Sequence, residues 1–328
     1  MSEPLATCGV RAGEPVRHAL DLLGDQWTLL ILQSVFLHIR RYEELRRRLG
    51  ISPTALSGRL NEAVAAGILT RVAYRDHNRT RLEYRLTEQG LPLWSLLVSI
   101  WAWEREWVAG RREQLPALTH LDCGVETAAP LGCGGCLRTV RLRDVDAAQG
   151  KPATIPMPST SRRFRRRDAD RLAGDPLLFF PATMELLGDR WSIALMVSSF
   201  FGAEHFSEYQ RELGIGPSVL SDRLARLRRV GVLRTGTAGT RTDAHAYRLT
   251  EMGRAFFPAL AFIVEFARTR CPSGEAGVFL RHRDCGHRLA PVLLCDHCGK
   301  PLERNAVRFE GGPDWSVRVP AVTSPPAK

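Results

Sequence analysis

The sequence lacks the features that would place a protein in a membrane or outside the cell. No apolar run reaches the roughly 18–20 residues that a membrane-spanning helix needs. The first residues, MSEPLATCGV, lack the basic-then-apolar order of a secretory signal. Cysteine is scarce, with eight in 328 residues, which excludes a disulfide-rich secreted scaffold. We therefore expect a cytoplasmic protein.

Lysine is scarce as well, and occurs only at positions 151, 300 and 328. Arginine supplies nearly all the positive charge of a chain whose formal net charge is +11. A basic balance favours a polyanionic partner, nucleic acid before membrane. Arginine together with abundant alanine is also typical of a GC-rich genome, so the charge alone is a modest argument.

The chain contains an internal repeat. The segment ISPTALSGRLNEAVAAG at 51–67 recurs as IGPSVLSDRLARLRRVG at 215–231, and LLGDQW at 22–27 recurs as LLGDRW at 186–191. The offset is 164 residues each time, which is half the chain length. The chain is therefore a tandem duplication, and each copy is long enough to bury its own core.

Residues 51–67 indicate a turn followed by an amphipathic helix. Ser52 is a candidate N-cap, and Pro53 takes the first helical position, where its missing N–H costs nothing. Apolar residues then recur at helical spacing and form one face: Leu56, Leu60, Ala63 and Val64. Small polar residues and one arginine lie away from that face, which suits a helix that enters a DNA groove.

Both copies predict the same order of elements. In the first copy these are a helical region, a helix-turn-helix, a β-hairpin and a long helix, at 14–38, 40–67, 68–86 and 87–108. The second copy repeats them at 176–201, 205–230, 232–249 and 250–270. This is the order of a winged helix. We expect a mainly α fold with small β-hairpins (α+β), made of two tandem winged helix-turn-helix domains, each followed by a long helix and a small Cys/His segment.

The expected boundaries are a first winged-helix domain at 8–110, a Cys/His segment at 111–140, a linker at 141–172, a second winged-helix domain at 173–272, a second Cys/His segment at 273–310 and a disordered tail at 311–328. Within the linker, the run SRRFRRRDADR is dense in arginine. It is either a solvated linker or an extra arm that contacts phosphates.

Several of these motifs occur together in one known family. They are LDLLGDQWTLLIL at 20–32, RRYEELRRRLGISPTALSGRL at 40–60, AGIL at 66–69 and EYRLTEQG at 83–90, with counterparts at 184–196, 212–224, 230–233 and 246–253. Each copy resembles the HxlR-type winged helix-turn-helix regulators, relatives of the MarR group. The resemblance implies a DNA-binding transcription regulator that acts as a dimer, with the helix after the wing at the dimer interface. Two copies in one chain would form a covalent pseudo-dimer.

We expect the two recognition helices to read bases and the wings to contact phosphates or the minor groove. The candidate DNA-binding residues are Ser52, Thr54, Ser57, Arg59, Asn61, Arg75, Arg79, Arg81, Ser218, Ser221, Arg223 and Arg241. For Arg59 and Arg223, an intradomain salt bridge or a phosphate contact is the alternative. Asp222 replaces Gly58 in the second copy and would repel phosphate. We therefore expect the first copy to contribute more binding energy.

A second repeated pattern is His-x2-Cys-x9-Cys-x2-Cys. It comprises His120, Cys123, Cys133 and Cys136 in the first copy, and His282, Cys285, Cys295 and Cys298 in the second. One histidine and three thiolates satisfy tetrahedral zinc, so we expect one structural zinc site within each copy. Reduced cysteines packed in a tail subdomain, or a redox switch through the Cys-x2-Cys pairs, are the alternatives.

The predicted function is a transcription regulator that recognises a pseudo-palindromic operator through two winged helices and responds to an effector. Tryptophans at 94, 101, 103 and 107 favour a helix–helix interface, although a small-molecule pocket between the copies stays open. Two chains could associate further. The alternative function is a metal- or redox-sensing protein-interaction module with the same fold and weak DNA binding. No enzyme is expected, because paired carboxylates, a phosphate loop and a nucleophile–base arrangement are all lacking.

Overall fold

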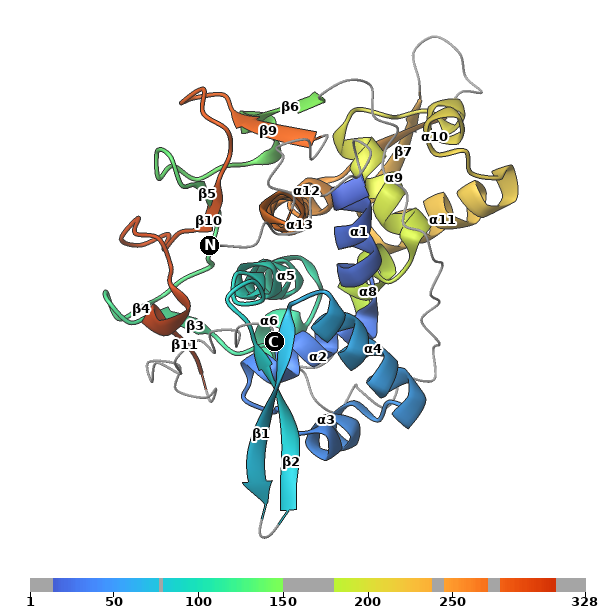
Figure 1. The fold of residues 1–328 in the computed structure, drawn as a ribbon. Helices are drawn as coiled ribbons and strands as arrows, with labels where there is room; N and C mark the ends of the chain where they lie inside the picture. Colours follow the sequence, from blue (N-terminus) through green and yellow to red (C-terminus); the bar gives the residue numbers. More distant parts are fainter. Residues whose placement is uncertain (1–13, 77–78, 150–179, 238–244, 271–277, 311–328) are drawn as a thin grey trace, which may run out of the picture.

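The structure is a computed structural model that describes residues 14–76, 79–149, 180–237, 245–270 and 278–310 (Figure 1). Three features that the sequence analysis named lie outside these residues: the arginine-rich run at 161–171, Arg241 and the tail at 311–328. Among the described residues, none of the helices is both long and apolar enough to cross a membrane.

The first copy forms a winged helix, as the sequence predicts. Its elements are α1 Glu14–Leu23, α2 Gln26–Phe36, α3 Tyr42–Leu49, α4 Pro53–Ala65, β1 Leu69–Asp76, β2 Arg79–Leu86, α5 Leu93–Trp107 and the single turn α6 Arg111–Gln114. The first helical region is two helices, because Asp25 has extended backbone and caps α2 by accepting from the Thr28 backbone N–H at 3.0 Å. Strands β1 and β2 pair antiparallel and form the wing.

The second copy repeats this arrangement. Its elements are α8 Pro181–Leu187, α9 Arg190–Phe200, α10 Phe206–Leu213, α11 Pro217–Val230, β7 Leu233–Thr237, β8 His245–Leu249, α12 Glu251–Arg254 and α13 Phe257–Thr269. Asp189 caps α9 through the Ser192 backbone N–H at 3.1 Å, as Asp25 caps α2. The mixed α/β fold with two tandem winged helices is therefore confirmed.

The helix-turn-helix has a local cause in each copy. Helix α3 ends at Gly50, whose left-handed backbone (φ 60°) carries no steric penalty in glycine. Ser52 then caps α4 by accepting from the Ala55 N–H at 3.3 Å, and Pro53 opens the helix. In the second copy Gly214 (φ 59°) ends α10 in the same conformation. Gly216 replaces the capping serine there, so α11 begins without a side-chain cap.

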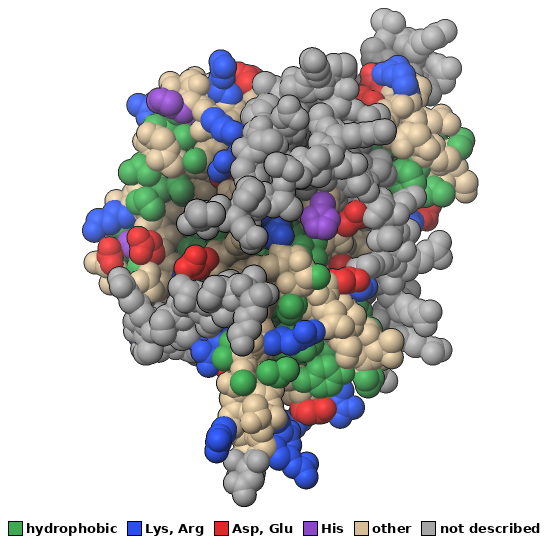
Figure 2. Space-filling view, in the orientation of Figure 1, with side chains coloured by type: hydrophobic (Ala, Val, Ile, Leu, Met, Phe, Trp, Pro, Cys, Tyr) green, Lys and Arg blue, Asp and Glu red, His purple; other side chains and the backbone are tan. Residues whose placement is uncertain are grey.

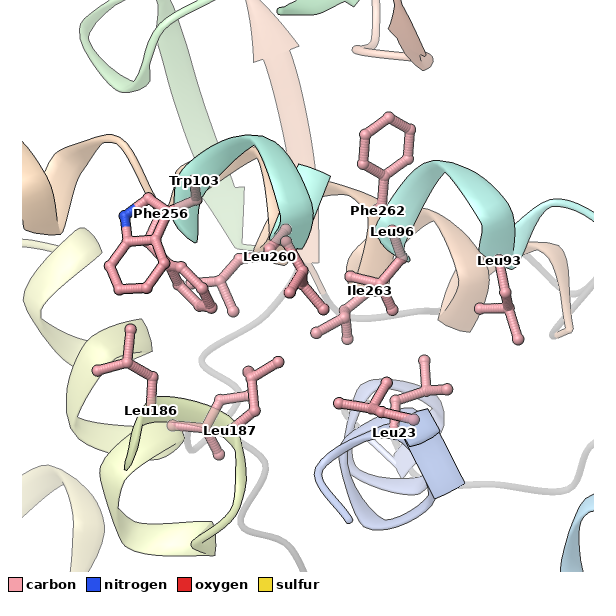
Figure 3. Packing of buried hydrophobic residues seen from close by; sticks show 14 of the residues in the cluster. Leu23, Leu93, Leu96, Trp103, Leu186, Leu187, Phe256, Leu260, Phe262 and Ile263 are labelled. Carbon is pink, nitrogen blue, oxygen red and sulfur yellow. The ribbon is translucent and has the colours of Figure 1, made fainter. Parts of the chain in front are cut away.

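The two copies share one hydrophobic core. Helices α5 and α13 pack against each other, α1 packs against α13, and α5 reaches α8. Figure 3 shows side chains from all four helices meeting there, among them Leu23, Leu96, Trp103, Leu186, Leu187, Leu260 and Ile263. The Trp103 indole N–H donates to the Met252 carbonyl at 2.9 Å, across the boundary between the copies. The buried tryptophans Trp101 and Trp103 thus fit the interface interpretation.

The two Cys/His segments form one intertwined unit. Its elements are β3 Leu118–His120, β4 Val125–Glu126, β5 Leu131–Cys133, the 3₁₀ turn η1 Leu142–Asp144, β6 Val145–Gln149, β9 Val278–His282, β10 Pro291–Leu293, the 3₁₀ turn η2 Arg304–Ala306 and β11 Val307–Phe309. Strands β3, β5 and β9 each pair with a strand from the other copy: β11, β10 and β6. The first part of the expected linker, 142–149, is therefore structured as η1 and β6.

The recognition helices α4 and α11 lie on the same side of the molecule, with α1 and α8 between them (Figure 1). The intertwined Cys/His unit lies on the other side, beyond α5 and α13. The paired helices α5 and α13 therefore connect the two regions where function was expected.

Candidate nucleic-acid interface and metal centres

The start of α4 presents polar side chains to solvent. Thr54 and Asn61 are exposed. Ser57 is half-buried, with its hydroxyl 3.2 Å from the Tyr42 hydroxyl of α3. Ser52 is exposed, and its hydroxyl caps the helix. Asn61 accepts from Arg71 of the wing strand β1 at 2.5 Å, which joins the recognition helix to the wing. The N-terminal half of α4 is thus free to meet a groove.

Arg59 does not face outward with these residues. Its Nε lies 2.6 Å from the Asp25 carboxylate, and its side chain is 16% exposed. A second contact joins Arg59 to Glu62 one turn further along α4, at 3.2 Å. The intradomain salt bridge that the sequence left open is the arrangement found here.

The second recognition helix has the same internal ion pair. Arg223 is buried, and its Nε lies 2.6 Å from Asp189. Arg223 also contacts Asp222 beside it on α11. Ser218 and Ser221 are exposed near the start of α11, as is Asp222. The second helix therefore presents a carboxylate where the first presents Gly58.

Asp25 and Asp189 are functional residues that the sequence analysis missed. Each is buried, caps the second helix of its copy and holds the arginine of its recognition helix. Asp25 therefore links α2 to α4, and Asp189 links α9 to α11, which holds each recognition helix at a fixed angle to its neighbour. A signal for this role was available, because the aspartate is invariant between the repeated motifs LLGDQW and LLGDRW, as is the arginine that follows 34 residues later.

The first wing is basic and exposed. Arg75 and Arg79 are exposed near its tip. Arg81 is exposed too, and forms an ion pair with Asp76 at 3.0 Å. Figure 2 shows Lys and Arg side chains around the wing at the lower end of the molecule. Positive charge on a projecting hairpin suits contact with a phosphate backbone.

The eight predicted metal ligands form two groups of four, and the grouping differs from the sequence prediction. One group contains His120, Cys123, Cys295 and Cys298, and the other contains Cys133, Cys136, His282 and Cys285. The expectation of one tetrad within each copy is therefore wrong. Each group takes its His-x2-Cys pair from one copy and its Cys-x2-Cys pair from the other, because the strands that carry these pairs are paired across the copies.

The geometry of both groups fits a tetrahedral metal. Zinc–sulfur bonds of about 2.3 Å place two sulfurs of a tetrahedron roughly 3.8 Å apart, and bonds to nitrogen of about 2.0–2.1 Å place nitrogen and sulfur roughly 3.5 Å apart. The Sγ atoms of Cys123 and Cys295 are 3.7 Å apart. Those of Cys133 and Cys285 are 3.8 Å apart. Four of the six histidine Nδ1 to sulfur distances are 3.3–3.4 Å.

The thiols within each group differ in pKa. Each group holds one thiol whose pKa is lowered to about 6, Cys295 or Cys285, and one whose pKa is raised, Cys123 or Cys136, where a backbone N–H lowers the pKa but burial and hydrogen bonds from the neighbouring cysteines outweigh it. For Cys285 the His287 backbone N–H is the main cause of the lowered pKa. For Cys295, burial opposes the change, and the backbone N–H groups of Cys298 and His297 outweigh it, so that its pKa falls. His120 and His282 are buried with Nδ1 directed at the sulfurs. The described cysteines form no disulfide, so their sulfurs are available to a metal as thiolates.

Comparison with known proteins bears on the DNA-facing half of the molecule. The chain matches HxlR-like helix-turn-helix domains twice, over residues 22–112 and 186–275, which together cover more than half of its length. The chain belongs to the HxlR-like helix-turn-helix family. It is therefore a DNA-binding transcription regulator with two such domains in tandem.

Similar proteins carry the same description. An uncharacterised HTH-type transcriptional regulator of Mycobacterium bovis is 34% identical over 137 residues, which are 42% of this chain and 87% of that protein. One from Bacillus subtilis is 32% identical over 91 residues, 27% of this chain and 83% of that protein. A solved structure described as a candidate transcription factor is 30% identical, with a TM-score of 0.32, over 39% of this chain and 89% of its own. The family and these relatives are transcription regulators, which are not enzymes.

Proposed function

We propose that the chain recognises a pseudo-palindromic operator with both recognition helices at once, as a covalent pseudo-dimer. The observation that carries this proposal is the position of α4 and α11 on the same side of one shared core, each with exposed polar residues at its start. The winged-helix domains at 8–110 and 173–272 are the DNA-reading units. Helix-turn-helix dimers bind half-sites about one turn of duplex apart, or multiples of it.

The side chains divide into three roles in this proposal. Thr54, Ser57 and Asn61 read bases in one half-site, and Ser218 and Ser221 read bases in the other. The wing arginines contact phosphates: Arg75, Arg79, Arg81 and Arg241. Arg59 and Arg223 hold their helices at the reading angle through Asp25 and Asp189, and Ser52 begins the first helix. The first half-site contributes more energy, because Asp222 repels phosphate in the second.

We also propose that the two Cys/His groups bind zinc. Three thiolates and one imidazole form a soft donor set that zinc prefers, and four protein ligands leave no coordination position open for catalysis. The metal is structural, and the chain has no catalytic activity. Zinc analysis of the purified chain is expected to give two ions per chain, and a content far below one would refute the assignment.

Regulation by a small molecule is part of the proposal. A polar cavity of about 260 Å³ lies between α8, the start of α9 and α11, and is lined by Met184, Glu185, Gly188, Asp189, Asp222, Arg223 and Arg226. An effector bound there would touch the Asp189–Arg223 pair and so change the angle of α11. The chain acts where the chromosome is, in the cytoplasm.

The test is selection of bound sequences from random duplex DNA by the full-length chain. Two related half-sites in opposite orientation are expected. Thr54→Ala should relax the sequence choice in one half-site only, and Ser221→Ala in the other. Thr139→Ala is the control, since Thr139 is also exposed but lies in the Cys/His unit, away from the recognition helices. A single half-site, or no enrichment, would overturn two-helix recognition. Gel filtration of the bound complex would show whether one chain or two occupy the site.

A further inference from the structure

The strand pairing in the Cys/His unit follows a two-fold pattern between the copies. In β3–β11 Val307 pairs with His120, and in β6–β9 Val145 pairs with His282. The two pairs correspond: His120 plus 162 positions is His282, and Val307 minus 162 positions is Val145. The β5–β10 pair Leu131 and Leu293 is its own counterpart under this correspondence and so lies at the pseudo-two-fold axis.

Each copy therefore completes a metal centre that begins on the other copy. We infer that each of the two metal centres is a zinc staple that fastens the tail of one copy onto the body of the other, so that zinc holds the two winged helices in one fixed frame. The inference rests on the proposed function for its DNA consequence. Its structural content, shared zinc ligands, rests on the proposed zinc binding together with the grouping of side chains.

The Cys/His unit, to which both copies contribute, needs such a fastening. Strands β3, β5, β10 and β11 have three residues each, which is too short for a stable ribbon in water. Small units of this kind are usually held by metal or disulfides. Two backbone bonds join the unit near the histidines: Leu121 N–H donates to Ala306 at 2.8 Å, and Arg283 N–H donates to Asp144 at 2.9 Å. Both bonds cross between the copies.

The staple acts on the helices that connect to the DNA side. Phe309 of β11 packs edge-on against Trp101 of α5, with ring centroids 5.1 Å apart. Arg105 of α5 pairs with Glu126 of β4 at 2.8 Å. Helix α5 in turn packs against α13 and α8. A zinc ion bound by His120, Cys123, Cys295 and Cys298 thus ties the Cys/His segment of the second copy to the helix that follows the first wing.

Pairs of cysteine substitutions distinguish shared centres from centres within each copy. Cys123 and Cys295 belong to one shared centre, so Cys123→Ser/Cys295→Ser should leave one zinc per chain. Cys123 and Cys133 belong to different shared centres, so Cys123→Ser/Cys133→Ser should leave none. Ligation within each copy gives the reverse result. The two variants are matched because each loses two ligand thiols, and zinc is measured by mass spectrometry after buffer exchange.

Hydrogen exchange supplies a readout that survives if a double variant fails to fold. Cys298→Ser should speed exchange at 118–121 of the first copy, whereas Cys136→Ser should speed it at 278–283 of the second. Chelation of the wild-type chain should speed both. Faster exchange confined to the copy that carries the substitution, or no change on chelation, would overturn the shared centres.

Binding to duplexes with one or two half-sites tests the consequence for DNA. Chelation should weaken binding to the two-half-site duplex by about tenfold, because the shared core still joins the copies but α5 and α13 are no longer braced by the Cys/His unit, which lowers the effective concentration of the second contact. Binding to the single-half-site duplex should stay nearly unchanged. Equal loss on both duplexes would refute the role of zinc as a frame. A wild-type chain that binds neither duplex would overturn the proposed function, while the zinc counts and the exchange rates would still decide whether the centres are shared.

Discussion

Arg59→Met is expected to lower the free energy of unfolding, although Arg59 lies in a recognition helix. The Asp25 carboxylate is only 6% exposed and accepts three bonds: from the Thr28 backbone N–H and hydroxyl at 3.0 Å each, and from Arg59 Nε at 2.6 Å. Methionine keeps most of the side-chain volume and removes the positive charge. A buried carboxylate would then remain without its cation.

The magnitude follows from the burial of the two groups. Removal of one partner from a buried ion pair costs about 3–5 kcal/mol. Arg59 is 16% exposed, and Asp25 keeps two hydrogen bonds, so we expect a loss of about 2–3 kcal/mol for Arg59→Met. Each kcal/mol lowers Tm by roughly 2–4 °C in a domain of this size. For Arg223→Met, whose side chain is 11% exposed, the loss should be at the upper end of that range.

Thermal unfolding by circular dichroism, with DNA affinity of the folded protein measured below the transition, is the assay. Arg47→Met is the control, because Arg47 is exposed on α3 and a surface substitution should stay within about 0.5 kcal/mol. Asp25→Asn/Arg59→Met removes both charges and should recover part of the lost stability. The reasoning fails if Arg59→Met keeps the wild-type Tm while sequence selectivity is lost, since that result assigns Arg59 to base contact.

Three further changes have defined outcomes. Arg79→Ala should weaken operator binding more than Arg241→Ala does, and should lower the salt dependence of binding by about one counterion. Equal losses of affinity would contradict the larger contribution of the first copy. Burial raises the pKa of Glu104, so the native chain holds that proton more tightly than the unfolded chain and stability should fall as pH rises above about 4.5. Glu104→Gln keeps an acceptor for Thr183 and has no proton to lose, so its free energy of unfolding, measured by urea titration, should fall less between pH 5 and pH 8 than that of the wild type. An equal fall in both proteins would argue against a raised pKa at Glu104. Trp103→Phe loses the bond to Met252 and should cost about 1 kcal/mol by urea unfolding, whereas the same change at exposed Trp107 should cost less.

Local signals were sufficient to predict the winged helices. The cap at Ser52 and the proline at the next position placed the start of α4, which runs Pro53–Ala65. The helix after the wing was expected from Thr87 but begins at Leu93. Thr87 uses its hydroxyl to accept from the Gly90 N–H at 3.1 Å and to donate to the Gly67 carbonyl, so it closes a turn instead of starting the helix. A capping residue alone does not tell a turn from a helix start.

The role of Arg59 was harder to predict because it depends on a distant residue. Asp25 lies 34 positions earlier in the chain, and helical periodicity says nothing about contacts at that separation. The repeat offered an indirect signal, since both residues of the pair are kept in the second copy as Asp189 and Arg223. Residues whose identity survives duplication while their exposed neighbours change are candidates for such internal pairs.

The grouping of the metal ligands could not be predicted from spacing at all. A metal group needs one His-x2-Cys pair and one Cys-x2-Cys pair, and each copy carries one of both. Every group therefore has one histidine and three cysteines, whether its two pairs come from the same copy or from different copies. Only the strand pairing across the copies decides between the two groupings.

The exchange also has an energetic consequence. Ligation within a copy would close a loop of 10 residues between Cys123 and Cys133, whereas the shared centre joins Cys123 to Cys295, 172 residues apart. The free-energy cost of closing a loop in the unfolded chain grows as 1.5 RT times the logarithm of the loop length. A metal that closes the 172-residue loop would therefore favour the folded state by about 2.5 kcal/mol more than one that closes the 10-residue loop. A metal that binds locally could order only the tail that carries it. A metal bound across the duplication, as we propose, would join the two copies, so its removal should loosen the contacts of the Cys/His unit with α5 and, through α13 and α8, should be felt on the side of the recognition helices.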